Sequence, residues 1–373
     1  MQVLRVDKDN FYLHFEAIAF IGEDKAYAAS MLFNGLFEVD MISGKCKYVD
    51  MFPDERRNGR RLYFAAECCK GKIVFAPMTA ERIAVYDTVT GTFEMLEFMD
   101  SDNEQYRRGN KFSNVLVHDN KVFLIGATYP YIIKLDVATY NLEYIPINIT
   151  DCFNFRKGIL VGEVYYVSSF NSNYILEFDM RSEQVAVYNL PCDFKGSWNM
   201  CYDGNAFWLD SQRSDMALVC WEKKNNAVSM ISEFPEGFQA FSGNTWHRLI
   251  FSNGFIWAIP TKANMIIKID VGTQTVTCGQ KVQASDGEQT IYYFDYNNQV
   301  YLLQKDMKNP LICQADEEFM KFDILTSQFI SYGFKLTEGY EKLKCDYMKR
   351  MTQCFREQKA LSLHDYLSYI EKL

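Results

Sequence analysis

The feature that most constrains the fold is a repeat in which a short apolar strand ends in Asp and is followed by a turn of Thr, Ser or Gly. Successive copies are about 43 to 53 residues apart, and the degenerate copy Ala217–Glu222 fills the single gap in the series. The six clear copies are Leu36–Asp40, Ile83–Asp87, Ile132–Asp136, Ile175–Asp179, Ile266–Asp270 and Met320–Asp323. Seven copies at this period indicate a repeat architecture.

A second apolar strand precedes each Asp-ended strand, as in Lys72–Pro77 and Phe255–Pro260, and a further strand follows it, as in Gly91–Phe98. Four strands per repeat at this period are typical of a propeller blade, because a lone blade cannot bury both of its faces and stacking around an axis supplies the core. Aromatic residues make up 16% of the chain and favour pleated, half-buried strands. We therefore predict an all-β fold, a seven-bladed β-propeller of four-stranded antiparallel blades with a short C-terminal helical extension.

The expected domain boundaries follow from the repeat. Residues 1–336 form the propeller and residues 337–373 form a C-terminal helical tail. The blades are expected at about 11–53, 60–99, 111–148, 153–191, 196–235, 245–282 and 289–336. The last blade already contains four strands, so the way the ring closes stays open, although Leu4–Asp7 could add an outer strand there.

The tail breaks the strand pattern after Leu336. Apolar residues such as Tyr340, Leu343 and Tyr347 recur at helical spacing and predict an amphipathic helix from about Glu338 to Lys359. A second helix is expected to begin at Ser362, a good N-cap. The apolar faces either pack on the propeller or dock a partner. In the second case the expected partner-binding residues are Leu363, Tyr366, Leu367 and Ile370.

Composition and charge narrow the classes of partner. The formal net charge of −9 argues against nucleic-acid binding. No apolar run approaches the roughly 18 residues of a membrane helix, and the charged start does not resemble a signal peptide, so we expect a cytoplasmic protein without membrane insertion. The 11 cysteines are irregularly spaced, which is typical of buried free thiols and not of a disulfide framework.

The repeat shape, for example Gly254–Pro260 followed by Asn264–Asp270, resembles the β-propeller repeats of the kelch, NHL and streptogramin-lyase groups over about residues 11 to 336. This resemblance implies the fold. It does not select a function, because these groups include binding scaffolds, lyases and other enzymes.

Candidate ligand-binding residues lie where the innermost strands begin. An aromatic residue is there followed by a mostly polar one, and successive residues of a strand face opposite sides, so we expect one column to pack between blades and the other to approach the central channel. The pairs are Tyr63-Phe64, Phe112-Ser113, Phe155-Arg156, Trp198-Asn199, Trp246-His247 and Ile291-Tyr292. The predicted ligand-binding residues are Ser113, Arg156, Trp198, Asn199, Trp246 and His247. The alternative is that these polar groups only bond to neighbouring strands or channel water.

Basic residues in the loops that enter the second and third blades, including Arg60-Arg61, could form a cationic rim for a carboxylate, a phosphate or an acidic partner, or could be solvated loop charges. No metal-ligand spacing, phosphate loop or nucleophile motif is present in the sequence, so no metal site is predicted and the cofactor is unknown.

Two functions remain open. The first is a ligand- or protein-binding scaffold that uses the polar channel mouth for a small ligand or a peptide. The second is an enzyme, a lyase or hydrolase for a small hydroxylated or peptide-like substrate, with His247 as general acid or base, Arg156 and Arg248 as oxyanion-binding cations and Asn199 positioning the substrate.

The resemblance to streptogramin lyases bears on the second function, because that family uses histidines from neighbouring blades with a carboxylate and a magnesium ion. His247 resembles one of these histidines. Tyr292 and Tyr293 stand where a second histidine would be expected, which departs from the lyase pattern.

Overall fold

The strands of the protein form seven sheets in a computed structural model. The described residues are 13, 15–31, 33–56, 59–99, 110–149, 151–191, 194, 196–211, 217–240, 245–260, 263–281, 289–296, 299–306, 319–323, 328–331, 335–343 and 345–346. For residue 247 and for residues 289 to 331 this description covers the backbone alone.

The first three sheets begin with the innermost strand and proceed outwards. The first contains β1 (Phe15–Ile21), β2 (Lys25–Ser30), β3 (Leu36–Asp40), β4 (Lys45–Asp50) and β29 (Lys335–Glu338). The second contains β5 (Tyr63–Cys69), β6 (Lys72–Pro77), β7 (Ile83–Asp87) and β8 (Thr92–Leu96). The third contains β9 (Phe112–His118), β10 (Lys121–Gly126), β11 (Tyr131–Asp136) and β12 (Leu142–Pro146).

The remaining four sheets repeat this order. The fourth contains β13 (Ile159–Val161), β14 (Val164–Ser168), β15 (Tyr174–Asp179) and β16 (Gln184–Asn189). The fifth contains β17 (Met200–Tyr202), β18 (Phe207–Asp210), β19 (Leu218–Glu222) and β20 (Ala227–Ile231). The sixth contains β21 (Trp246–Ser252), β22 (Phe255–Pro260), β23 (Met265–Asp270) and β24 (Val276–Lys281). The seventh contains β25 (Gln289–Tyr296), β26 (Gln299–Asp306), β27 (Phe319–Asp323) and β28 (Gln328–Ser331).

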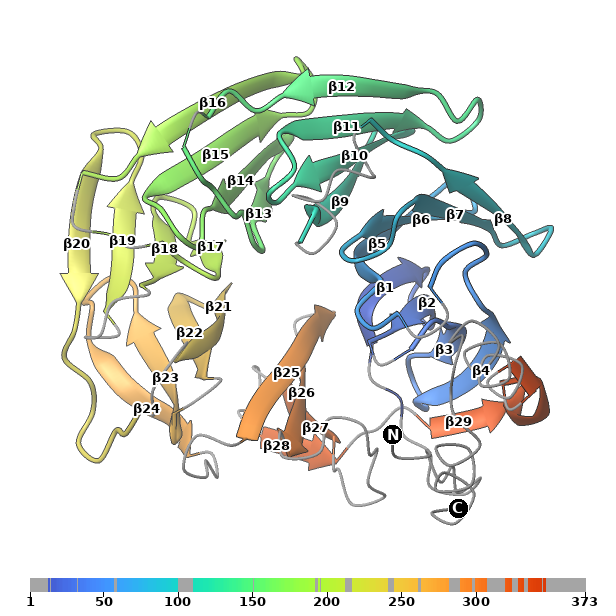
Figure 1. The fold of residues 1–373 in the computed structure, drawn as a ribbon. Helices are drawn as coiled ribbons and strands as arrows, with labels where there is room; N and C mark the ends of the chain where they lie inside the picture. Colours follow the sequence, from blue (N-terminus) through green and yellow to red (C-terminus); the bar gives the residue numbers. More distant parts are fainter. Residues whose placement is uncertain are drawn as a thin grey trace, which may run out of the picture.

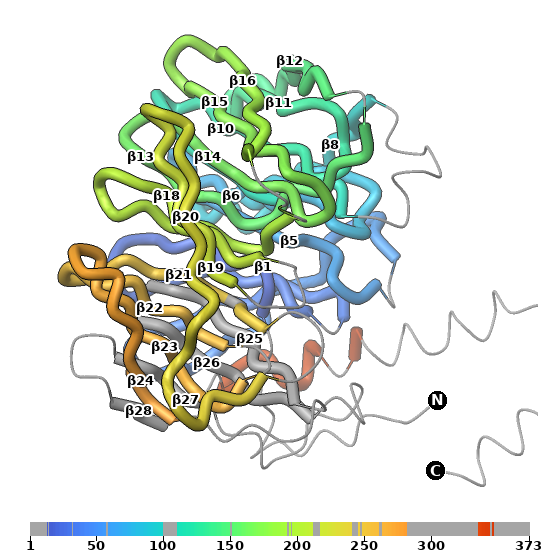
Figure 2. The backbone as a smooth tube through the Cα atoms, turned by 90° about the vertical axis from the view of Figure 1, so that its left-hand side faces the viewer, coloured from blue at the N-terminus to red at the C-terminus, as the bar shows by residue number. Residues whose placement is uncertain are grey.

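The sheets follow one another around a common axis in chain order, with β1, β5, β9, β13, β17 and β21 nearest to it (Figure 1). Figure 2 shows successive sheets side by side, as blades of a propeller. Within each sheet consecutive strands are antiparallel, and only the added strand β29 runs parallel to its neighbour β4. The fold is a β-propeller, as the repeat predicted. Among the described residues, no helix is long and apolar enough to cross a membrane.

The hydrophobic core lies between the sheets. Tyr27 of the first sheet packs with Phe75 of the second, and in the same way Trp208 of the fifth sheet packs with Trp246 of the sixth. Comparable clusters join every successive pair from the first sheet to the sixth. The side chains of β25–β28 lie outside the described set, so the seven-bladed count and the proposed domain boundaries stay predictions.

The Asp that ends the third strand of a repeat closes the turn that follows. In Asp87 the Oδ1 atom accepts hydrogen bonds from the backbone N–H groups of Val89 and Thr90, at 2.9 and 3.0 Å. Asp40, Asp136 and Asp179 make the same pair of bonds, and Asp270 accepts from Thr273. These bonds hold the pKa of each carboxyl group below its usual value. The repeated Asp is therefore a turn-forming residue.

The end of the chain returns to the first sheet. Strand β29 includes and extends past Leu336, where the sequence pattern predicted the strands to stop, and a helix begins at residue 340. Leu336 and Leu343 are buried in the cluster that contains Phe37 and Tyr48. The Tyr48 hydroxyl donates to Asp346 Oδ2 at 3.0 Å. The C-terminal segment therefore packs on the propeller here, as one of the two expectations for the tail proposed.

Several predictions for the chain ends fall outside the described residues. These are the strand at Leu4–Asp7, the continuation of the first helix beyond residue 346, the second helix from Ser362, and the partner-binding residues Leu363, Tyr366, Leu367 and Ile370.

Candidate functional site

Innermost strands of neighbouring sheets contact one another around the axis, as β1 does with β5 and β17 with β21. We call the region where these strands begin the channel mouth. In four sheets the pairing register shifts at the second residue of the innermost strand, as between Tyr63 and Ala65 of β5. The residues that fall at these shifts are Glu16, Phe64, Ser113 and His247. A β-bulge turns its extra residue away from the regular pleat. The expected alternation, in which one residue of the strand packs between blades and the next faces the channel, therefore does not apply at these four residues.

Four members of the aromatic column pack between sheets, whereas Trp198 is half-buried. Tyr63, Phe112, Phe155 and Trp246 are each at most 1% exposed. Trp246 stacks on Phe238 with ring centroids 5.6 Å apart. This packing places Trp246 in the core, away from a position where a ligand would touch its ring without rearrangement.

Ser113 and its neighbour connect strands. Ser113 is buried, and its hydroxyl donates to the carbonyl oxygen of Ile125 at 3.3 Å. Asn114 Nδ2 donates to the Tyr165 hydroxyl at 3.2 Å, and the backbone N–H of Gly158 donates to the same oxygen at 3.0 Å. At Ser113 the geometry matches the alternative in which a polar group only bonds to a neighbouring strand.

Arg156 differs from the other members of the column. Its guanidinium carbon lies 4.5 Å from the centroid of the Trp198 ring and 5.2 Å from that of Phe170, and these two rings meet edge to face. The Nε atom of Arg156 is buried and has no hydrogen-bond partner in the described ranges. Burial, and secondarily the charge of Arg61, lowers the pKa of Arg156 to about 10, while Glu16 opposes this shift. Arg156 therefore stays positively charged at neutral pH.

A second arginine at the mouth is fully paired. Arg61 comes just before β5, and its Nε donates to Glu16 Oε2 at 2.9 Å while its Nη2 bonds to Oε1 of the same carboxylate. This fork links the first and second sheets. Because both residues affect the pKa of Arg156 in the fourth sheet, three side chains from separate blades share one electrostatic environment.

Sequence reasoning named Arg61 as a rim residue but missed Glu16. The signal was available, since Phe15-Glu16 begins the first innermost strand with the same aromatic-polar pair as the other blades.

A buried carboxyl group holds the backbone beneath the Trp198 ring. Asp210 ends β18 and is 1% exposed. Its Oδ1 accepts hydrogen bonds from the backbone N–H groups of Trp198 and Asn199, both at 2.8 Å, and from Ser197 Oγ at 2.5 Å. Burial raises the pKa of Asp210 to about 6, and the hydrogen bonds oppose that shift. Asp210 thus positions the segment that supports Arg156.

Asn199 is fully buried, and neither Nδ2 nor Oδ1 of its side chain has a hydrogen-bond partner among the described residues. Its backbone bonds to Asp210, the last residue of β18, just as the backbone of Arg156 bonds to Ser168, the last residue of β14, one blade earlier. Buried amides of this kind are uncommon because the lost hydration is not replaced.

Arg248 lies in electrostatic range of Tyr165 and Cys201. Burial raises the pKa of Tyr165 to about 12, while bonds from Asn114 and Gly158 and the charge of Arg248 act in the opposite direction. The backbone of His247 lies at the bulge between Trp246 and Arg248, and its side chain is outside the described set. The structure therefore brings together Arg156, Trp198, Asn199 and the Glu16–Arg61 pair. The charge of Arg248 acts instead on Tyr165.

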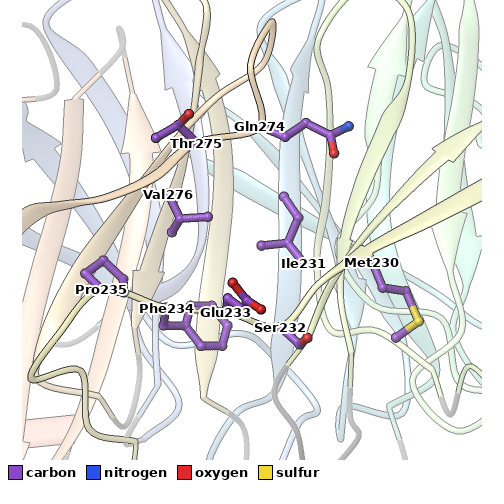
Figure 3. A pocket seen from close by; sticks show the side chains of 9 residues that line it. All are labelled: Met230, Ile231, Ser232, Glu233, Phe234, Pro235, Gln274, Thr275 and Val276. Atoms are coloured by element: carbon purple, nitrogen blue, oxygen red, sulfur yellow. The ribbon is translucent and has the colours of Figure 1, made fainter.

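A separate pocket lies on the outer strands of the fifth and sixth sheets, away from the channel mouth (Figure 3). Its volume is about 490 Å³, and Met230, Phe234, Pro235 and Val276 provide apolar lining while Glu233 is the one ionisable residue there. Within the described ranges, no group of three or more His, Cys, Asp or Glu side chains could hold a metal ion.

Comparison with known proteins supports the architecture. No protein-family model and no curated protein matches the chain. Among solved structures, a streptogramin B lyase matches with a TM-score of 0.56 and 15% identity, over 80% of this chain and 92% of that chain. A chain in the crystal structure of a mitotic checkpoint complex matches with a TM-score of 0.55 and 11% identity, over 80% of this chain and 86% of that one. At these identities the likeness shows a β-propeller fold and leaves the function undecided.

Proposed function

We propose that the protein is a binding propeller whose ligand site is the channel mouth. The observation that carries this proposal is the Arg156 guanidinium, which is held over Trp198 and beside Phe170 and has no hydrogen-bond acceptor among the residues that the structure describes. Aromatic rings and arginine are the residue types that most often anchor a bound partner. The bound partner is a small ligand or an exposed part of a peptide that enters the mouth.

The support around Arg156 favours binding over a purely structural role. Asp210 Oδ1 fixes the backbone of Trp198 and Asn199 through one hydrogen bond from each N–H group, and it accepts a third from the Ser197 hydroxyl. Such support keeps the ring in place before a ligand arrives, which reduces the entropy lost on binding.

A thermal-shift screen with sugars, nucleotides, peptides and carboxylates tests this proposal, because a ligand at 100 times its Kd stabilises a protein by roughly 2.7 kcal/mol. The test variant is Trp198→Ala at the mouth. The matched control is Phe251→Ala, whose side chain is 38% exposed and lies near the end of β21 that is away from the mouth. We expect a stabilising ligand whose effect is lost in Trp198→Ala and kept in Phe251→Ala. Equal loss in both variants, or no stabilising ligand in the screen, would contradict a site at the mouth.

The enzyme alternative, with His247 as general acid or base, keeps the same location but requires turnover. Incubating each screening hit with the protein and with His247→Ala, followed by mass spectrometry of the ligand, distinguishes the two. Conversion by the wild type alone would establish the enzyme, and an unchanged ligand would leave the binding function.

A further inference from the structure

Arg156 and Arg61 lie in one electrostatic environment, but they differ in whether a carboxylate is bonded to the guanidinium group. Arg61 is bonded through Nε and Nη2 to both carboxylate oxygens of Glu16. Arg156 has no ion pair or side-chain hydrogen bond within the described part of the chain, and its Nε is buried. A charge partly removed from water is costly unless it is paired, so Arg156 is a cation that an anionic group would stabilise.

The aromatic contacts determine which directions remain open around Arg156. Trp198 lies against the guanidinium, at 4.5 Å from its carbon, and Phe170 lies close by. The planar fork of arginine forms its hydrogen bonds at its edge, while its faces stack on aromatic rings. A ligand group must therefore approach along the edge, where a planar carboxylate can accept two parallel hydrogen bonds.

The charges near Arg156 also favour an anion. Glu16 is already neutralised by Arg61, and the carboxyl group of Asp210 is directed to the backbone of residues 198 and 199. In a chain of net charge −9, the mouth thus presents a cation to which no acidic side chain of the described residues is bonded.

We infer that the ligand of the proposed site carries a carboxylate group, and that Arg156 binds this group along the edge of its guanidinium while Trp198 covers the face. This inference rests on the proposed function and adds the chemical class of the ligand. The carboxylate belongs either to a small organic acid or to the C-terminus of a peptide.

The test compares ligands that differ only in charge. Binding of acetate, succinate and a tripeptide with a free C-terminus is measured by calorimetry or NMR titration against acetamide, succinamide and the same tripeptide with an amidated C-terminus. The variants are Arg156→Gln, Arg156→Lys, and Arg181→Gln as a control that removes one exposed arginine in a turn of the fourth sheet. Inorganic phosphate and sulfate form the third ligand group.

We expect at least one carboxylate to bind, its amide counterpart to bind at least tenfold more weakly, and Arg156→Gln to weaken carboxylate binding by roughly 10- to 100-fold, as for a lost charged hydrogen-bond pair. Arg156→Lys should retain part of the affinity because the charge remains without the fork. Arg181→Gln should stay within about twofold of wild type. Tighter binding of succinate would identify a small organic acid as the source of the carboxylate, and tighter binding of the free-ended tripeptide would identify a peptide C-terminus.

The failures of the two proposals are distinguishable. Neutral ligands that require Trp198 but bind equally well to Arg156→Gln would overturn the carboxylate inference and leave the binding site intact. Phosphate or sulfate binding without carboxylate binding, or carboxylate binding that Arg156→Gln does not change, would overturn it as well. If no ligand needs Trp198, the site itself is wrong. Should Arg156→Gln fold poorly, Arg156→Lys and the amide ligands still decide the question.

Discussion

The buried Asp210 carboxyl group provides the sharpest test of how the channel mouth is built. We consider Asp210→Asn, which keeps an oxygen in the Oδ1 position for the N–H groups of Trp198 and Asn199, and Asp210→Ala, which removes that acceptor. The first variant imitates the protonated acid. The second leaves buried donors without a partner.

The magnitude follows from the pKa of Asp210, which burial raises from 3.8 to about 6. Below about pH 3.8 the group is protonated in both the folded and unfolded states, and its charge costs nothing. Between pH 3.8 and 6 the unfolded state ionises first, so the folded protein loses stability as pH rises, and above pH 6 the full cost remains. A shift of about two units corresponds to about 3 kcal/mol.

The assay is urea unfolding of wild type and both variants between pH 4 and 7.5. The stability of Asp210→Asn relative to wild type should increase by about 3 kcal/mol across this range, because the variant carries no buried charge. Other titrating groups are common to both proteins and cancel in the difference. Asp210→Ala should be less stable than Asp210→Asn at every pH by at least about 2 kcal/mol, the cost of unsatisfied buried donors.

Parallel pH curves for wild type and Asp210→Asn would refute the reasoning, since they would mean that the Asp210 charge is not desolvated in the folded state. Equal stability of the Asn and Ala variants would refute the conclusion that Asp210 Oδ1 holds the backbone of Trp198 and Asn199 in place.

Three further predictions concern the rest of the fold. Leu343→Ala should destabilise the protein by about 2–5 kcal/mol in urea unfolding, because Leu343 is buried against Phe37 and Tyr48; a cost below about 1 kcal/mol would mean that the C-terminal helix does not share the core. Gly339→Ala should lower the Tm by several degrees, because Gly339 has a φ of +80° and an added Cβ would lie 2.8 Å from the Tyr48 carbonyl oxygen. The control Gly22→Ala, at a φ of +68° with open space around it, should lower the Tm by less, and equal losses of Tm would contradict the close approach at Gly339. The turn carboxylates such as Asp87 have lowered pKa values in the folded state, so the stability that they contribute is present above the ordinary pKa of Asp and is lost as pH falls through the folded-state pKa. Acid titration followed by circular dichroism should show a smaller acid-induced loss of stability for Asp87→Asn than for wild type. An identical loss would count against the turn bonds.

Much of the fold could be predicted because its signals are local. The Asp of each repeat bonds to N–H groups two and three residues later, so the residue type alone identifies the turn. The aromatic column was also predictable, because large apolar residues at a fixed strand position must be buried between sheets. Arg156 and Asn199 could be named because each directly follows a member of this column, and Trp198 because it belongs to it.

The sequence alone thus determined the repeat, the β-propeller fold and the ring of positions where a ligand could bind. Only the tertiary structure decided which of those positions are satisfied. It paired Glu16 with Arg61, gave the Arg156 side chain no acceptor within the described part of the chain, and bonded Asp210 to the Trp198 backbone. It also returned β29 to β4, almost 300 residues earlier in the chain. The physical reason is range: turns and strand patterns arise from neighbours in the chain, whereas ion pairs, bulges and the pairing of distant strands depend on which blades meet in space.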